Sequence, residues 1–335
     1  MTVLEARDLH VGFGPRAKGI PAVRAVDGVE LAIGRGEIVA LAGESGCGKT
    51  TLARTLLGLE RPYRGQVLHN GQPLQYSTRA LKAFRRTVQL VLQDPTGALN
   101  PRRTVYEAVA EGIRIHRLPG NERDQVAAAL ARAGLRPAER FVDRYPHELS
   151  GGQRQRVVIA GALALAPEII IADEPVSSLD ASVRGEILAL LLSLRDELGL
   201  TVLVVTHDLG LAWNIADRLA VMYLGRIVES GPTEAVLASP QHPYTEALLS
   251  VLPESKRMAP VILRGETPDP RRIPSGCRFH PRCPALASGR AAAVASECLS
   301  RHLPVLPSTP GHVAACLLAP SFAAGPPGVP RQAER

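Results

Sequence analysis

The chain has 335 residues, enough for one large domain or two smaller ones, and its 45% apolar and 21% charged residues exclude a disordered chain. Its formal net charge is +7, but residues 253–335 hold 11 basic and 5 acidic side chains, which accounts for +6 of that total. The first 252 residues are therefore almost neutral, which argues against a nucleic-acid-binding body. An aromatic content of 4% also disfavours a stacking platform for single strands.

The N-terminus lacks the basic and apolar regions of a signal peptide. The longest apolar stretch, residues 157–166, has about half the length needed to cross a bilayer. We therefore expect a protein that is neither secreted nor integral to a membrane. Its five cysteines would then lie in a reducing compartment, where a cluster indicates metal binding or catalysis more than disulfides.

The first 90 residues alternate short β-rich runs with turn signals. A helix is expected at 49–59, and Asn70-Gly71 predicts a tight turn. The expected strands are 3–13, 23–33, 37–42, 66–69 and 88–92.

From about residue 93 to 165 the apolar spacing becomes helical, with helices expected at 105–116, 122–133 and 152–165. Strands at 169–172 and 201–205, separated by a helix at 181–198, then imply parallel pairing with a right-handed crossover. The remaining expected elements are a helix at 209–217, strands around 219–229 and helices at 233–238 and 244–251. Beyond residue 253 the periodicity fades, and we expect 319–335 to be disordered.

A phosphate-binding motif follows the buried strand at 37–42. It reads Gly43-Glu44-Ser45-Gly46-Cys47-Gly48-Lys49-Thr50, matches G-x-x-x-x-G-K-[ST], and leads into a helix that continues with Thr51. The glycines let backbone N–H groups face the phosphates, Lys49 supplies a positive charge, and Thr50 supplies a hydroxyl to Mg²⁺. The sequence therefore predicts a nucleoside triphosphate site, in which we interpret Cys47 as a spacer that could make the site sensitive to oxidation.

Two adjacent acids, Asp173 and Glu174, end the apolar strand at 169–172. Asp173 is expected to hold Mg²⁺, and Glu174, which points differently, to polarise the attacking water. Alone the pair would be compatible with a solvated turn before Pro175. Together with the phosphate motif it predicts the metal anchor and the general base of a nucleoside triphosphate site.

Between these motifs lies Leu149-Ser150-Gly151-Gly152-Gln153, which opens an expected helix and would form a second anion site. With this segment the sequence resembles the ABC-type ATPases over residues 1 to about 250. The resemblance implies an α/β P-loop NTPase fold, with an antiparallel β subdomain, a RecA-like parallel core, a helical subdomain at about 93–165 and an irregular C-terminal extension. It also implies a head-to-tail dimer, in which this segment of one ATPase domain closes over the ATP of the other.

The same resemblance assigns four further residues. Gln93 matches the glutamine that touches Mg²⁺ or the lytic water, and Asp180, in Ser178-Leu179-Asp180, matches a loop that crosses the dimer interface. His207 matches the histidine that contacts the γ-phosphate. Phe13 is the candidate for stacking on adenine, with a core phenylalanine as the alternative.

Three segments indicate which subgroup of the ABC-type ATPases the sequence resembles. They are Gln93-Asp94-Pro95 with Ala98-Leu99-Asn100-Pro101-Arg102, then His242-Pro243-Tyr244-Thr245, and finally 276–284 with Cys298 and Cys316. They resemble ATPase subunits of dipeptide and oligopeptide importers. This resemblance implies a second ATPase subunit (itself or a paralogue), two transmembrane permeases, an extracytoplasmic solute-binding protein and no nucleic acid, at the cytoplasmic face of the membrane.

Four cysteines of the C-terminal region, Cys277, Cys283, Cys298 and Cys316, have spacings C-x5-C, C-x14-C and C-x17-C, without the paired CxxC typical of zinc sites. In a reducing compartment such thiolates could bind a [4Fe-4S] cluster, Zn²⁺ or no metal. The resemblance favours the cluster.

We therefore expect an ATPase domain at 1–252, an importer-type extension with the cysteines at 253–318, and a disordered tail at 319–335. The leading functional hypothesis is the ATP-hydrolysing subunit of an importer for di- and oligopeptides, or for nickel or another small solute. The alternative is a soluble ABC ATPase of DNA repair or translation. Against it stand the single ATPase unit, the neutral body and the lack of a long coiled-coil insertion between Gln93 and Leu149.

Overall fold

The computed structural model describes residues 1–17, 20–252, 260–308 and 311–320. The chain divides into two compact units. Unit 1 comprises Met1, Ile33–Ile38 and Leu74–Val205, and unit 2 comprises Thr2–Ala32, Val39–Pro73 and Thr206–Arg335. The boundaries expected from the sequence, at about 252 and 318, remain predictions.

Unit 1 contains three neighbouring parallel strands, β6 (Val88–Val91), β7 (Ile169–Asp173) and β8 (Thr201–Thr206). The register pairs Val91 with Ala172 and Asp173 with Val205. Helix α7 (Ala181–Leu198) connects β7 to β8, which confirms the expected strand-helix-strand order. The continuous apolar runs of β7 and β8 are buried, as expected of strands covered on both faces.

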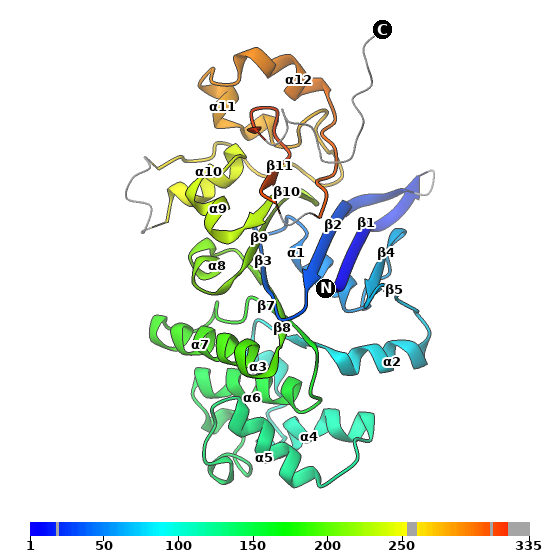
Figure 1. Ribbon diagram of the computed structural model, residues 1–335, viewed down its shortest axis with the longest axis vertical. Helices are drawn as coiled ribbons and strands as arrows, with labels where there is room; N and C mark the ends of the chain where they lie inside the picture. Colours follow the sequence, from blue (N-terminus) through cyan, green and yellow to red (C-terminus); the bar gives the residue numbers. More distant parts are fainter. Residues whose placement is uncertain (18–19, 253–259, 309–310, 321–335) are drawn as a thin grey trace. The chain divides into compact units, whose positions relative to one another are not determined.

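Unit 1 also contains a group of helices. Helices α4, α5 and α6 pack against one another in Figure 1, through apolar residues spaced three or four apart. Their bounds, with those of the other helices of the unit, are α2 (Thr78–Thr87), α3 (Pro95–Ala98), α4 (Val105–His116), α5 (Glu122–Arg132), η1 (Ala138–Arg140), η2 (Pro146–Glu148) and α6 (Gly151–Leu163).

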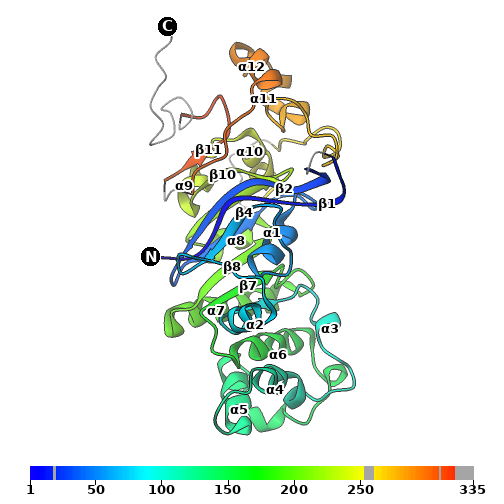
Figure 2. The same ribbon diagram turned by 90° about the vertical axis from the view of Figure 1, so that its right-hand side faces the viewer.

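Unit 2 begins with an antiparallel sheet in the order β2-β1-β4-β5. Its strands are β1 (Thr2–Ala17), β2 (Ile20–Gly34), β4 (Arg64–His69) and β5 (Gln72–Pro73). Strands β1, β2 and β4 lie side by side in Figures 1 and 2, and β1 pairs with β4 from Leu4 opposite His69. The predicted turn is confirmed: Asn70 and Gly71 both have positive φ, as a tight hairpin turn requires.

A second group of strands in unit 2 runs in the order β11-β10-β9-β3. Strand β3 (Ile38–Ala42) pairs with β9 (Arg218–Tyr223) in parallel, while β10 (Arg226–Pro232) and β11 (Val313–Ala314) continue antiparallel. The helices here are α1 (Lys49–Leu56), α8 (Leu209–Ile215), α9 (Thr233–Ala238) and α10 (Pro243–Ser250). Helix α1 is shorter than expected because Gly58, at φ +65°, follows its end.

The C-terminal extension holds short elements that the sequence did not indicate. They are η3 (His280–Arg282), α11 (Pro284–Ala287), η4 (Ala292–Val294) and α12 (Ala295–Ser300), in addition to β11. Phe279 and Ala285 are buried, so this region is packed despite its weak periodicity. Of the tail expected to be disordered, Ala319 is buried, and 321–335 lie outside the described residues.

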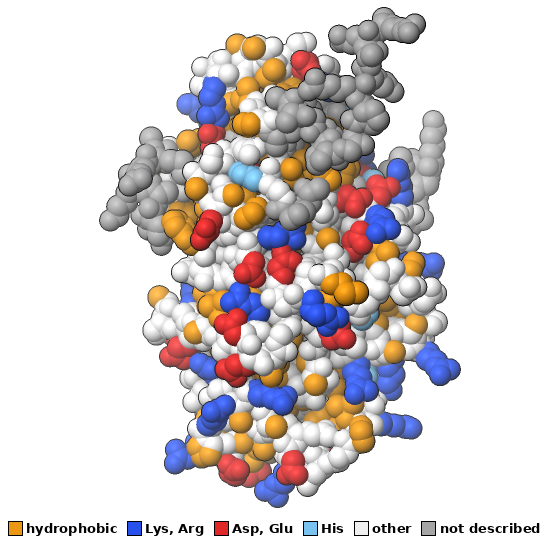
Figure 3. Space-filling model, in the orientation of Figure 1, with side chains coloured by type: hydrophobic (Ala, Val, Ile, Leu, Met, Phe, Trp, Pro, Cys, Tyr) orange, Lys and Arg blue, Asp and Glu red, His pale blue; other side chains and the backbone are white. Residues whose placement is uncertain are grey.

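Side chains of both charge signs are interspersed over the face shown in Figure 3, with apolar ones scattered between them. Among the described residues, a search for a helix with the length and hydropathy of a bilayer-spanning segment finds none.

Candidate nucleotide site

The phosphate loop lies in unit 2, between β3 and α1. Gly43, Gly46 and Gly48 all have positive φ, at 148°, 78° and 110°. A Cβ at Gly43 would lie 2.2 Å from the carbonyl oxygen of Met222, and one at Gly48 would lie 2.1 Å from that of Ala25. Only glycine fits these two positions, so the loop geometry follows from the motif itself.

Lys49 begins α1, and its side chain is only 6% exposed. Its Nζ donates hydrogen bonds to the carbonyl oxygens of Gly43, at 2.7 Å, and Glu44, at 2.9 Å. The ammonium group is thus fixed on the first two residues of the loop. Thr50 and Thr51 follow in the first turn of α1, at the helix terminus whose dipole favours an anion.

Cys47 is almost fully buried, and this burial raises the pKa of its thiol. A buried thiol with a raised pKa is a poor nucleophile, which agrees with its interpretation as a spacer. The same environment disfavours the oxidation that the sequence suggested. By contrast, Ser45 and Gly46 are exposed.

Unit 1 carries the residues expected to act on the attacking water. Gln93 follows β6, and Asp173 ends β7, so both lie at the carboxyl ends of neighbouring parallel strands. The Nε2 of Gln93 donates to Glu174 Oε2 at 3.2 Å. Glu174 has φ +47°, which is uncommon for a residue with a side chain, and its N–H donates to the carbonyl of Val205 at 2.9 Å. This strained backbone fixes the direction of a carboxylate that sequence reasoning assigned to catalysis.

Helix α6 of unit 1 begins with the segment expected to form the second anion site. Ser150 is its N-cap, and Ser150 and Gln153 form a reciprocal capping box: Ser150 Oγ accepts from the Gln153 N–H, and Gln153 Oε1 accepts from the Ser150 N–H. A Cβ at Gly152 would lie 2.5 Å from Val183 of α7, while Gly151 has more room. The segment is therefore required for the local fold as well as suited to an anion.

The remaining predicted residues lie on three different elements. Asp180 caps α7 by accepting from the Val183 N–H at 3.0 Å. Its pKa is lowered by that hydrogen bond and by Ser182. His207 follows β8 and precedes Asp208, the N-cap of α8. Phe13 of β1 is 44% exposed, which excludes a core role and leaves its ring available for stacking.

The four C-terminal cysteines come together in unit 2. All four are free thiols and line one cavity of about 20 Å³, with Phe279 among the other lining residues. The pKa of Cys277 is raised to about 12, mainly by burial, and the other three thiols contribute to this rise. However, no group of three or more His, Cys, Asp or Glu among the described residues is arranged to hold a metal ion. The donors fit a thiolate-bound metal in number and type, without forming a ligand geometry.

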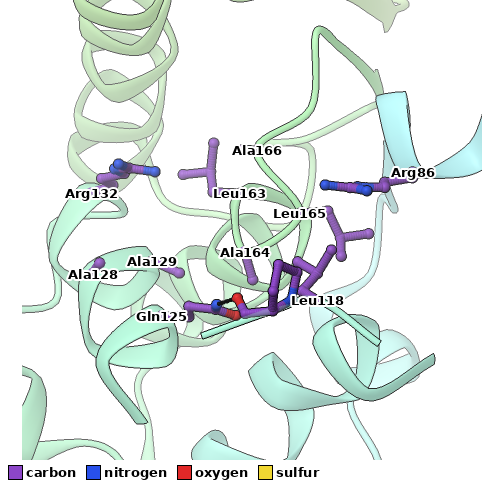
Figure 4. Close-up of a pocket in the computed structure, with 11 residues that line it drawn as sticks. Arg86, Leu118, Gln125, Ala128, Ala129, Arg132, Leu163, Ala164, Leu165 and Ala166 are labelled. Atoms are coloured by element: carbon purple, nitrogen blue, oxygen red, sulfur yellow. Dashed lines mark hydrogen bonds between the residues drawn. The ribbon is translucent and has the colours of Figure 1, made fainter. Parts of the chain in front are cut away.

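A pocket of about 310 Å³ lies elsewhere in unit 1 and contains none of the predicted site residues. Figure 4 shows Arg86 and Arg132 on opposite sides of it, with the apolar side chain of Leu163 between them.

Sequence reasoning assigned no role to three residues that the structure joins at the phosphate loop, namely Glu44, Tyr244 and Arg282. Glu44 occupies a variable position of the motif, and Arg282 lies among the cysteines. The only available signal was that each is part of a recognised motif.

The phosphate loop, the acids after β7 and the Ser150 segment together define an ATPase of the ABC transporter class. In agreement, the sequence pattern described as "ABC transporter" matches residues 26–177, and that of "Oligopeptide/dipeptide transporter, C-terminal region" matches residues 228–288. The oligopeptide transport ATP-binding protein AppF of Bacillus subtilis is 40% identical over 331 residues, or 95% of this chain and 97% of AppF. The dipeptide transport ATP-binding protein DppF of Haemophilus influenzae is 45% identical over 281 residues, or 81% and 85%.

Among solved structures, the dimeric post-hydrolysis state of the ATP-binding cassette MJ0796 bound to ADP and Pi matches with a TM-score of 0.60 at 30% identity, over 69% of this chain and 98% of that one. The chain belongs to the family of oligopeptide and dipeptide transport ATP-binding proteins of ABC transporters. The P-loop NTPase fold expected from the sequence is thereby confirmed, and so is ATPase activity as its class of reaction.

Proposed function

We propose that this ATPase powers the uptake of di- and oligopeptides through two permeases supplied by a solute-binding protein. The observation that carries the proposal is similarity over nearly the full chain, including the C-terminal region, to proteins named for peptide transport. The C-terminal region lies outside the part of the chain that matches the ABC transporter pattern, so it carries information about the type of transporter. Import of nickel or another small solute is the alternative outcome.

Hydrolysis would use a side chain from each of the predicted motifs. Lys49 would bind the β- and γ-phosphates, and Glu174, oriented by Gln93, would accept a proton from the attacking water. Thr50 and Asp173 offer the oxygen donors that Mg²⁺ prefers, and Mg²⁺ would neutralise charge on the phosphates. His207 would contact the γ-phosphate, and Phe13 would stack on adenine.

A dimer would complete the site. Because Ser150 Oγ accepts from the backbone of α6, its own O–H can donate to a phosphate oxygen held by a second ATPase subunit. Gly151, Gly152 and Gln153 would present the helix terminus, and Asp180 would lie at the subunit interface. The dimeric state of MJ0796 supports this arrangement.

The permeases would bind the segment around Gln93, at the cytoplasmic face of the membrane. Asp94 caps the short helix α3 there by accepting from the N–H groups of Thr96 and Gly97, and Leu92 is 44% exposed. An ordered, exposed and partly apolar segment is suited to gripping a partner helix.

We further propose that the four cysteines bind a [4Fe-4S] cluster, with Zn²⁺ or no metal as the other outcomes. Their convergence on one cavity supports this assignment. A cluster would supply either a structural cross-link or a redox centre. Anaerobic purification should yield a brown protein with about four iron and four acid-labile sulfide per chain. A colourless protein loaded with zinc would exclude the cluster.

Peptide import can be tested in cells in which this gene is deleted and then restored. Uptake of a radiolabelled tripeptide should fall on deletion and return with the wild-type chain, but not with Glu174→Gln, which should still bind ATP. Unchanged tripeptide uptake, with loss of nickel or oligosaccharide uptake, would overturn the peptide assignment while leaving the ATPase class intact.

A further inference from the structure

An ion pair connects the C-terminal extension to the phosphate loop. Arg282 donates from Nη1 to Glu44 Oε2 at 2.7 Å and from Nη2 to Glu44 Oε1 at 3.0 Å. The arginine side chain is 7% exposed and the glutamate 28%. Thr267 adds a hydroxyl 3.4 Å from the same carboxylate. A bidentate pair of this kind fixes both direction and distance, and Glu44 raises the pKa of Arg282 accordingly.

The backbone of Glu44 is held as well. Its N–H donates to the hydroxyl of Tyr244 at 2.8 Å, and its carbonyl oxygen accepts from Lys49 Nζ at 2.9 Å. Glu44 therefore contacts the extension through its side chain, helix α10 through its amide, and the lysine expected to bind phosphate through its carbonyl oxygen.

The elements that supply these contacts share one core with the loop. Phe279 lies in the same short segment as Arg282, and its ring packs against Tyr223 and Tyr244, with ring centroids 5.1 Å and 5.3 Å away. Ala42, which directly precedes the phosphate loop, belongs to the same buried cluster. The guanidinium of Arg282 is thus positioned by packing rather than by a free surface chain.

An acidic side chain in a phosphate-binding loop needs an explanation, because it repels the phosphates of ATP. A pair as buried as this one is also a poor source of stability, since desolvation of the two charges offsets their attraction. Arg282 neutralises Glu44 and keeps its carboxylate directed toward the extension. Without Arg282, the carboxylate would repel ATP and compete for the ammonium group of Lys49.

We propose that Arg282 is a positioning residue for ATP binding, which sequesters Glu44 and thereby lets the C-terminal extension set the affinity of the phosphate loop. The proposal rests on ATP binding at this loop and is independent of the transported solute and of any metal at the cysteines.

The test compares ATP binding and hydrolysis in the full-length chain. Arg282→Ala should raise the dissociation constant and the KM for ATP at least about tenfold, with kcat at saturating ATP within about twofold of wild type. The defect should shrink at high salt, because its origin is an unscreened charge. Arg282→Lys should recover part of the affinity. Adding Glu44→Gln to Arg282→Ala should restore affinity, since it removes the repelling charge.

Arg290→Ala is the matched control. Arg290 of the same extension forms an ion pair with Glu246 of α10, with Nη1 2.9 Å from Oε1. This pair does not involve the phosphate loop, so ATP affinity should stay unchanged. If Arg282→Ala folds poorly, ATP titration of Arg282→Lys and of the double variant still decides the question. The proposal would be overturned if Arg282→Ala bound ATP with wild-type affinity, or if the double variant bound ATP no more tightly than Arg282→Ala alone. The ion pair would then have a structural role only.

Discussion

Asp27 shows how a single buried carboxylate ties the N-terminal sheet to the C-terminal extension. It lies 3.1 Å from His10 Nδ1 and forms ion pairs with Arg24 and Arg278. Burial alone would raise its pKa, but the hydrogen bonds with His10 and Arg278, together with the charges of Arg278 and Arg24, hold the pKa of Asp27 well below its usual range. The ionised form is therefore strongly preferred in the folded protein.

A pH-dependent loss of stability follows. Because the folded pKa lies below the unfolded value of about 3.9, the stabilisation is complete above that pH and is lost as the pH falls through the folded pKa. Asp27→Asn should cost roughly 3 kcal/mol at pH 7. In urea unfolding, the difference between the two proteins should narrow below about pH 4.

Glu111→Gln provides a control for Asp27→Asn, because Glu111 forms an exposed ion pair with Arg103 at 2.8 Å. Such pairs contribute less than about 1 kcal/mol. A difference between wild type and Asp27→Asn that stays constant from pH 7 to the acid limit of folding would contradict the assigned ionisation.

At the scale of elements, helix α6 combines a folding role with a predicted catalytic one at Ser150. Ser150→Ala should remove the N-cap and cost about 1 kcal/mol of stability. Ser150→Asp should keep the cap, since aspartate is a favoured N-cap, and yet abolish ATP hydrolysis by placing a carboxylate where a phosphate would bind. Thermal unfolding and ATPase rates separate the two effects.

The control for Ser150 is Thr104, the N-cap of α4, which forms an equivalent capping box with Glu107. Thr104→Ala should lose stability by a similar amount while retaining hydrolysis. If Ser150→Asp hydrolyses ATP normally, Ser150 is a structural cap alone.

The elements predicted most accurately are those whose residues determine them locally. The helices at 105–116 and 181–198 have the bounds expected, because apolar spacing and the caps Thr104 and Asp180 act within each segment. Helix α2 was missed, since Phe84 is its only buried residue and leaves no apolar period to detect.

The short elements of the C-terminal extension could not be predicted, because local residues do not determine them. Its short helices depend on distant contacts, such as the N–H of Cys277 donating to Cys298 and Arg278 donating to the carbonyl of Leu224. In the nucleotide site, too, local features were predictable and long-range contacts were not. Its motifs name the residues that meet phosphate, but the pairing of Glu44 with Arg282 spans 238 positions and leaves no local pattern.

At the scale of the whole molecule, the phosphate loop and the Ser150 segment occur in one chain, on different compact units. If two copies pair head to tail, each complete site takes its loop from one copy and its Ser150 from the other. Complementation can therefore tell whether the chain pairs with itself. Lys49→Ala and Ser150→Asp should each be inactive alone as homodimers.

Mixed in equal amounts, the two variants should regain about a quarter of wild-type ATPase activity, because half of the dimers are mixed and each of those contains one intact site. Subunits that carry both substitutions serve as the control, since no pairing of them builds an intact site. Activity that stays at background in the mixture, while the wild-type chain hydrolyses ATP only after a second, unlike ATPase subunit is added, would assign the partner to a paralogue.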